Sequence, residues 1–170
     1  MDDKKPDIDQ REEFFFEKET RKHQQEVAKI MIMFAQELLR RAMVHDASKL
    51  EDPEREGFKK ATPGLRDLTY GSAEYSEVLK EMGPTLRHHY AHNDHHPEYF
   101  DTDPSCNGVD EMSLFQVVEM ICDWMAAVKR HADGDIFDSL RKNKVRFGMG
   151  PQLHKILINT AHQIKEMDDD

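Results

Sequence analysis

The stretch from His88 to Tyr99 constrains this chain more than any other, because it reads HHYAHNDHHPEY. It holds half of the ten histidines of the protein, namely His88, His89, His92, His95 and His96. Neutral imidazole is the commonest protein ligand of transition metals, and its pKa near neutrality also suits proton transfer. A solvated polar face is the simpler explanation, but such faces are mostly filled by Lys, Glu and Arg. The stretch therefore favours a fold that is built around a histidine-lined site.

Size and charge narrow the classes of protein to consider. The 170 residues suit one domain with a single core. A formal net charge of −10 argues against general binding to nucleic acid, which needs a basic surface. Cys106 and Cys122 are too far apart for a CxxC motif and no secretory segment is recognised, so a cytoplasmic location is expected. The longest apolar runs are too short to span a bilayer, so no membrane partner is expected.

Apolar residues recur at helical spacing along most of the chain, and no β-hairpin signal interrupts them. Capping residues mark the helix starts, namely Asp52 before Pro53, Ser72, Ser113 with Gln116, and Asp135. The helices are expected at residues 14–43, 53–62, 73–81, 114–130, 136–145 and from 151 onwards, with one more that restarts at Pro84 and carries His88, His89 and His92. The sequence thus predicts an all-α fold, a single bundle of about five to seven helices over residues 13–167. A mobile tail is expected at residues 1–12 and an acidic tail at residues 168–170.

Other metal ligands are suggested outside the histidine-rich stretch. His23 extends the expected buried stripe of the first helix (Val27, Ile30, Met31, Phe34 and Leu38) by one turn. It is either a hydrogen-bonded core residue or a ligand. His45 and Asp46 are adjacent, so both reach one metal only where the backbone approaches it closely, and a helix end with an aspartate turn is the alternative. Asp123 projects away from the apolar stripe of its helix, toward either solvent or a close-packed site.

Pro97 divides the histidine-rich stretch into two parts. The residue before a proline is pushed toward extended backbone, so the helix is expected to end before His96. His95, His96 and Glu98 then lie on a turn that points away from the direction of the helix. In chain order, the candidate ligands are therefore His23, His45, Asp46, His89, His95, His96 and Asp123.

This order, with its adjacent His-Asp pair, resembles the HD-domain metallophosphohydrolase superfamily. The resemblance implies an HD-like helical bundle that binds one or two divalent metals through these side chains. The run from His45 to Lys49, HDASK, is similar to the HDxxK form, in which the lysine lies beside the metal. The run from His95 to Glu98, HHPE, is similar to the His-His-Glu element of the binuclear cyclic-dinucleotide phosphodiesterases. The GYP element of that branch is absent, so cyclic dinucleotides are not the expected substrates.

The chain from about His23 to Thr160 also resembles a small family of phage and bacterial proteins. The shared blocks read HDASK, HHYAHNDHHPEYF, EMICDWMAAVKRHADGD and ILINT. This second resemblance implies a bacterial cell or a phage-infected host as the setting, and it attaches no reaction to the chain.

The HD resemblance implies a metal-dependent phosphohydrolase that cleaves a small phosphate ester, most naturally a nucleotide, with metal-activated water. Asp46 would bridge two metals, Lys49 would steady the phosphate, and Glu98 would orient a ligating histidine or accept a proton. Substrate-binding candidates are Lys49, Asn93, Arg130, Lys144 and Arg146. A nitrogen and oxygen ligand set without thiolate favours Mn, Fe, Co, Ni or Zn, with Mg also accepted.

Two other functions fit the same side chains. HD-like folds with histidine-rich di-iron sites include oxygenases, which would keep the site and change the reaction. A metal-stabilised module that binds a nucleotide or a host factor without turnover is the second alternative. The sequence is compatible with a homo-oligomer.

Overall fold

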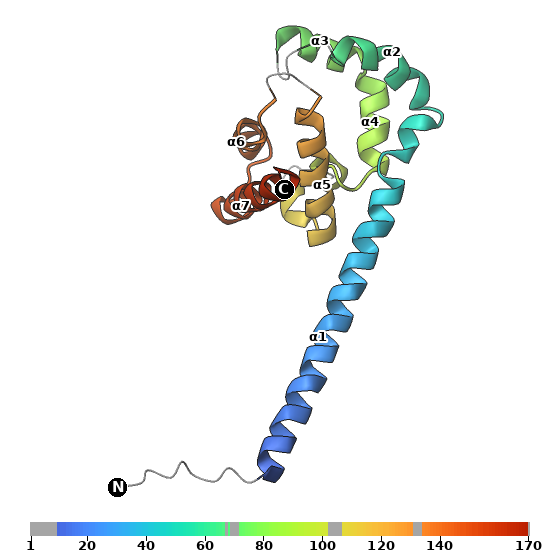
Figure 1. Ribbon diagram of the computed structural model, residues 1–170. Helices are drawn as coiled ribbons and strands as arrows, with labels where there is room; N and C mark the ends of the chain where they lie inside the picture. Colours follow the sequence, from blue (N-terminus) through green and yellow to red (C-terminus); the bar gives the residue numbers. More distant parts are fainter. Residues whose placement is uncertain (1–9, 67, 69–71, 102–106, 131–133, 170) are drawn as a thin grey trace. The chain divides into compact units, whose positions relative to one another are not determined.

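The computed structural model describes residues 10–66, 68, 72–101, 107–130 and 134–169, and within these ranges the chain is all-α (Figure 1). The described residues form seven α-helices, three short 3-10 helices and no strand. In chain order these are α1 (Gln10–Val44), η1 (Ala47–Leu50), α2 (Arg55–Arg66), α3 (Ala73–Glu81), α4 (Gly83–His92), η2 (Pro97–Phe100), η3 (Gly108–Glu111), α5 (Leu114–Val128), α6 (Ile136–Arg146) and α7 (Pro151–Asp169). The predicted fold class is confirmed. None of the described helices combines the length and the apolar content needed to cross a membrane.

The chain divides into two compact units, Met1–Met43 and Val44–Asp170. Neither unit coincides with the single domain predicted for residues 13–167. Helix α1 begins at Gln10, inside the predicted N-terminal tail, and α7 continues to Asp169, inside the predicted acidic tail. The rest of the tail predictions, at residues 1–9 and 170, lies outside the described residues.

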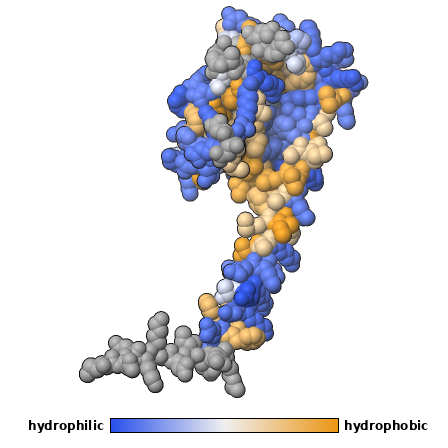
Figure 2. Space-filling model, in the orientation of Figure 1, coloured by the Kyte–Doolittle hydropathy of each residue, from blue (hydrophilic) through white to orange (hydrophobic). Residues whose placement is uncertain are grey.

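The described part of the first unit is the single helix α1, so its apolar side chains have no second element of that unit to pack against. Val27, Ile30 and Met31 are 41%, 63% and 67% exposed, which does not agree with the predicted buried stripe. Figure 2 shows apolar side chains interleaved with hydrophilic ones along this helix. The helical period identified the secondary structure correctly, because it reports which side chains share a face. It does not report what covers that face.

Helices α5, α6 and α7 pack against one another and carry the apolar core of the second unit. The buried apolar residues of this core are Val109, Val117, Met120, Ile121, Met125, Ile136, Leu140, Met149, Leu157 and Ala161. Two of the predicted caps are present here: Ser113 and Gln116 form a capping box on α5, and the Asp135 side chain accepts a hydrogen bond from the amide of Phe137 at the start of α6. The helix start predicted at Asp52 and Pro53 is wrong, because α2 begins at Arg55.

Helices α2, α3 and α4 follow one another in contact and form the other half of the second unit. Among the described residues from 54 to 92, the only buried apolar side chains are Ala61 and Met82, whereas Glu54, just before α2, and His89 on α4 are buried although they are polar. Ser72 caps α3 as predicted. The end predicted for α2 near Thr62 is wrong, because the helix continues through Pro63 to Arg66. A proline removes one backbone donor, and this one lies close enough to the helix end for the remaining turn to persist.

Leu157 and Ile156 give a matched test of the core, because they are neighbours on α7 with 2% and 50% exposure. We expect Leu157→Ala to lower the free energy of unfolding by about 3 kcal/mol, through lost burial and the cavity left behind. Ile156→Ala should cost about 1 kcal/mol, because half of that side chain is already in water. Denaturant unfolding of the two variants measures both values. Equal losses would contradict the core described above.

Candidate metal centre

The His45-Asp46 pair lies at the corner between α1 and η1. Asp46 adopts a left-handed backbone conformation, with φ 56° and ψ 16°. This region is uncommon for residues with a side chain, but Asp and Asn enter it several times more often than others. The corner brings His45 Nε2 to 3.3 Å from Asp46 Oδ2, although adjacent residues diverge on a helix. The close backbone approach that the pair requires is therefore present.

Helix α4 and the turn after it supply three imidazoles to the other side of Asp46. His89 Nε2 lies 3.3 Å and His95 Nε2 3.5 Å from Asp46 Oδ1. His96 Nε2 lies 2.9 Å from His89 Nε2. The turn arises as predicted, because α4 ends at His92 and Pro97 begins η2. The two oxygens of Asp46 thus face different histidines.

Helix α5 adds Asp123, whose Oδ1 lies 3.7 Å from His45 Nε2. The Asp123 side chain is 16% exposed, so it faces a packed site rather than solvent. Among the described residues, three sets of side chains have donor atoms within 4.8 Å of one another, and Asp46 belongs to two of them. The sets are Asp46 with His89, His95 and His96, then His45 with Asp46 and Asp123, and then His45 with His95 and Glu119.

Two glutamates contact the same imidazoles from outside. His45 Nδ1 donates to Glu119 Oε1 at 2.8 Å, and His95 Nδ1 lies 3.3 Å from the same oxygen. His89 Nδ1 donates to Glu54 Oε2 at 2.9 Å. Neither glutamate was predicted as a site residue from the sequence. The i, i+4 spacing of Glu119 and Asp123 on α5 was the signal that could have found the first, since such pairs share a helix face.

The donor set fits a divalent cation. Asp46 Oδ1 and His95 Nε2 are buried and have no hydrogen-bond partner among the described residues. Both atoms belong to the ligand sets, and buried polar atoms are normally satisfied. Carboxylate oxygens mixed with imidazole nitrogens are ligands that Mn, Fe, Co, Ni and Zn accept.

The electrostatics of the site favour positive charge at its centre. Hydrogen bonds with Asp123, Asp46 and Glu119 raise the pKa of His45 to about 11. The carboxylates that hold this proton would equally hold a metal cation. Burial, with the neighbouring charges of His95 and His89, lowers the pKa of His96 to about 3. Burial also lowers the pKa of His95, so both of these imidazoles stay neutral, the form that ligates metal.

The structure gives each of the remaining residues of the histidine-rich stretch an internal role. His88 Nδ1 donates to Glu54 Oε1 at 2.8 Å, and His92 stacks on the His88 ring with centroids 4.0 Å apart. The Asn93 amide donates to Ser48 Oγ at 2.9 Å and to the His89 carbonyl at 2.8 Å. Asn93 was a candidate for substrate binding, and these contacts instead tie it to the frame of the site.

Lys49 and Glu98 differ in how closely they approach the site. Lys49 Nζ donates to Asp46 Oδ2 and lies 4.9 Å from the centre of the Phe58 ring, so its charge is beside the ligands as the HDxxK resemblance implied. Glu98 Oε1 instead accepts a hydrogen bond from Arg146 at 2.7 Å. Glu98 was expected to orient a ligating histidine or to accept a proton, and both roles stay predictions. The carboxylates that contact Nδ1 of candidate ligands are those of Glu54 and Glu119.

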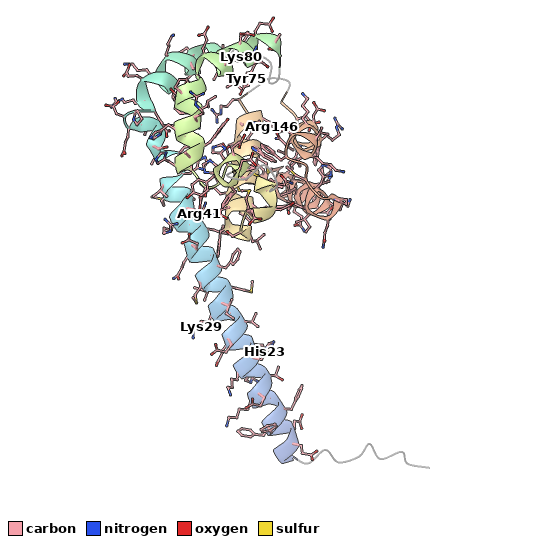
Figure 3. The ribbon with its side chains drawn as sticks, turned by 180° about the vertical axis from the view of Figure 1, so that it is seen from behind. His23, Lys29, Arg41, Tyr75, Lys80 and Arg146 are labelled. Atoms are coloured by element: carbon pink, nitrogen blue, oxygen red, sulfur yellow. The ribbon has the colours of Figure 1, made fainter. Side chains whose placement is uncertain are left out.

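The other candidates are His23, Arg130 and Lys144. His23 lies on the part of α1 that belongs to the first unit, and its side chain is exposed (Figure 3). Its role as a ligand stays a prediction. Arg130 is exposed beyond the end of α5, and Lys144 is half-buried on α6. Within the described residues, the structure records no contact of Arg130 or Lys144 with a candidate ligand.

A cleft of about 600 Å³ opens beside the site, lined by Arg87, Tyr90, Ala91, Glu98 and Tyr99. The Tyr90 ring packs on His96, with ring centroids 4.8 Å apart. One wall of the cleft is therefore in contact with a candidate ligand. Two tyrosines and an arginine at the rim suit a ligand that combines a planar ring with negative charge.

Comparison with known proteins gives one match. The sequence model of a family described as "Family of unknown function (DUF5662)" matches residues 12–163. Neither the curated proteins nor the solved structures compared with the chain gave a match.

Proposed function

The chain belongs to this family of unknown function, and we propose that it is a metal-dependent phosphohydrolase with an HD-like site, acting on a small phosphate ester such as a nucleotide. The observation that carries the proposal is the convergence of imidazole nitrogens on both oxygens of Asp46. His45 approaches Oδ2, whereas His89 and His95 approach Oδ1. A carboxylate with donors gathered at each oxygen suits two cations that share one bridging ligand.

The protein side chains divide into two ligand sets around that bridge. His45 and Asp123 would hold one cation together with Asp46, and His89, His95 and His96 would hold the other. A bound divalent cation supplies an activated water and neutralises charge on a phosphoryl oxygen. The burial of His89 and His95 excludes bulk water from the inner side of the site, which strengthens every charge interaction there.

Lys49 and the cleft support a phosphorylated substrate. The Lys49 ammonium lies beside Asp46 at the edge of the ligand sets, where a phosphate oxygen would meet it. The organic part of the substrate would extend into the cleft, past Tyr90 and toward Tyr99 and Arg87. A nucleoside fits this description, because its base can lie against aromatic side chains while a further phosphate meets the guanidinium.

The direct test is phosphate release from a broad nucleotide panel by protein loaded in turn with Mn, Co, Ni, Zn and Fe. We expect metal content of one or two equivalents by elemental analysis and release of phosphate or pyrophosphate from at least one nucleotide. Oxygen consumption by an iron-loaded protein that releases no phosphate would instead support the alternative function, an HD-like di-iron oxygenase. Tight nucleotide binding without turnover would support the binding module.

Arg87 provides a test of the cleft, since its side chain is exposed and lines the cavity without being a candidate ligand. We expect Arg87→Ala to raise KM for a nucleotide substrate by tenfold or more, because a charge-assisted contact contributes about 1.5–3 kcal/mol. We expect kcat to stay unchanged, since the contact of Arg87 with the substrate is remote from the reacting phosphate. Arg55→Ala, an exposed arginine at the start of α2, is the control and should leave KM unchanged. Equal KM values in both variants would place the substrate elsewhere.

A further inference from the structure

Glu54 and Glu119 lie behind the ligating imidazoles, on the side away from Asp46. We infer that both are positioning residues of the metal centre, which hold the ligand histidines by Nδ1 so that each Nε2 faces Asp46. Glu119 serves His45 and His95, and Glu54 serves His89. This inference rests on the proposed metal centre, and it does not depend on which reaction that centre carries out.

The orientation follows from the chemistry of imidazole. A neutral ring carries one N–H, and a carboxylate that accepts a hydrogen bond at Nδ1 keeps the proton there. The lone pair of Nε2 is then free to bind a metal. The contacts of His45, His89 and His95 all have this form, with Nδ1 toward a glutamate and Nε2 toward Asp46. The negative charge behind the ring also makes each imidazole a stronger ligand.

Glu119 connects the two ligand sets. One oxygen, Oε1, contacts His45 of the set with Asp123 and also His95 of the set with His89. The Glu119 side chain is 12% exposed, so water screens its charge only weakly. Loss of this charge should therefore weaken metal binding in both sets at once.

Glu54 is held more deeply, because its side chain has no exposed surface. Besides His89, it accepts hydrogen bonds from Ser48 Oγ at 2.8 Å and from His88 Nδ1 at 2.8 Å. A buried carboxylate is costly unless it is fully paired, so this arrangement also ties η1 and the turn before α2 to α4. The test has to separate orientation of His89 from this structural tie.

The decisive variants are Glu119→Gln and Glu54→Gln, which keep the shape and an accepting oxygen but remove the charge. The readout is the dissociation constant of Co²⁺ or Zn²⁺, measured by competition with a chromophoric chelator at a temperature where circular dichroism shows each variant folded. We expect each dissociation constant to rise 10- to 100-fold. Glu56→Gln, which changes an exposed glutamate on α2 two residues after Glu54, is the control and should bind metal like the wild type.

His88→Ala distinguishes the two partners of Glu54. His88 contacts Glu54 but belongs to no ligand set among the described residues, so its removal should change the dissociation constant less than twofold. If Glu54→Gln does not fold, the dissociation constant of Glu119→Gln alone tests the inference.

Several outcomes would overturn the inference. A lower melting temperature with an unchanged dissociation constant would make the glutamates structural only. Loss of one whole metal equivalent in Glu119→Gln would make Glu119 a ligand, as its set with His45 and His95 allows. A wild type that binds no metal would remove both this inference and the proposed function. A wild type that binds metal and releases no phosphate would remove the phosphohydrolase proposal alone.

Discussion

Replacing Asp46 with asparagine is expected to empty the metal centre and to lower metal-dependent phosphate release by about 10³-fold or more. Asp46 is the residue that the two main ligand sets share, and its two oxygens face His45 on one side and His89 with His95 on the other. Removing its charge therefore weakens both positions together. Elemental analysis of the purified variant and an assay on the best nucleotide substrate measure the two effects.

Asparagine is the informative replacement because of the backbone at this position. Residue 46 has φ 56°, a left-handed conformation that Asn adopts about as readily as Asp. Alanine would add backbone strain, so a loss of metal in Asp46→Ala could reflect a distorted corner. Asp138→Asn on α6, where the carboxylate pairs with Arg141 and Lys142, is the matched control. Asp46→Asn protein with full metal content would contradict the shared role of this residue.

The sequence was sufficient to predict the helical fold, and it named six of the residues that lie close together in the candidate site. Helical periods and caps such as Ser72 and Asp135 depend on neighbours in the chain, so they can be identified without a structure. From the sequence, His45 and Asp46 were expected to reach one metal only if the backbone there approaches the metal closely. In the structure, the two side chains come together because residue 46 has a left-handed backbone conformation. Composition alone does not reveal that φ value.

The residues that support the site were not predictable in the same way. Glu54 follows Pro53 near a helix start, where an acidic residue has an ordinary explanation in the helix dipole. Its contacts with His88 and His89 join residues more than thirty positions apart. Glu98 was expected to orient a ligating histidine or to accept a proton, and its Oε1 pairs with Arg146. The side chains of the candidate ligand sets could be named from the sequence, whereas the carboxylates that contact them from outside depend on tertiary packing.

Removing the metal is expected to destabilise the second unit, and to do so unevenly. At a free metal concentration about a thousandfold above the dissociation constant, binding contributes about 4 kcal/mol to folding. Chelation should therefore lower the melting temperature by on the order of 10 °C. Differential scanning calorimetry with and without a chelator measures the shift. Asp46→Asn protein, which lacks the site, should show no chelator-dependent change.

The unevenness follows from where the apolar core lies. Buried apolar residues of α5, α6 and α7 pack together without help from the site, whereas the α2–α4 half contributes only Ala61 and Met82 among its described residues. Polar contacts join the two halves, including His45 with Glu119 and Gln116 with Asp94 at 2.7 Å. Hydrogen exchange of metal-free protein should therefore rise first in α2, η1 and α4, with α5–α7 still protected. Equal exchange in both halves would mean that the core, rather than the ligand sets, holds the α2–α4 half in place.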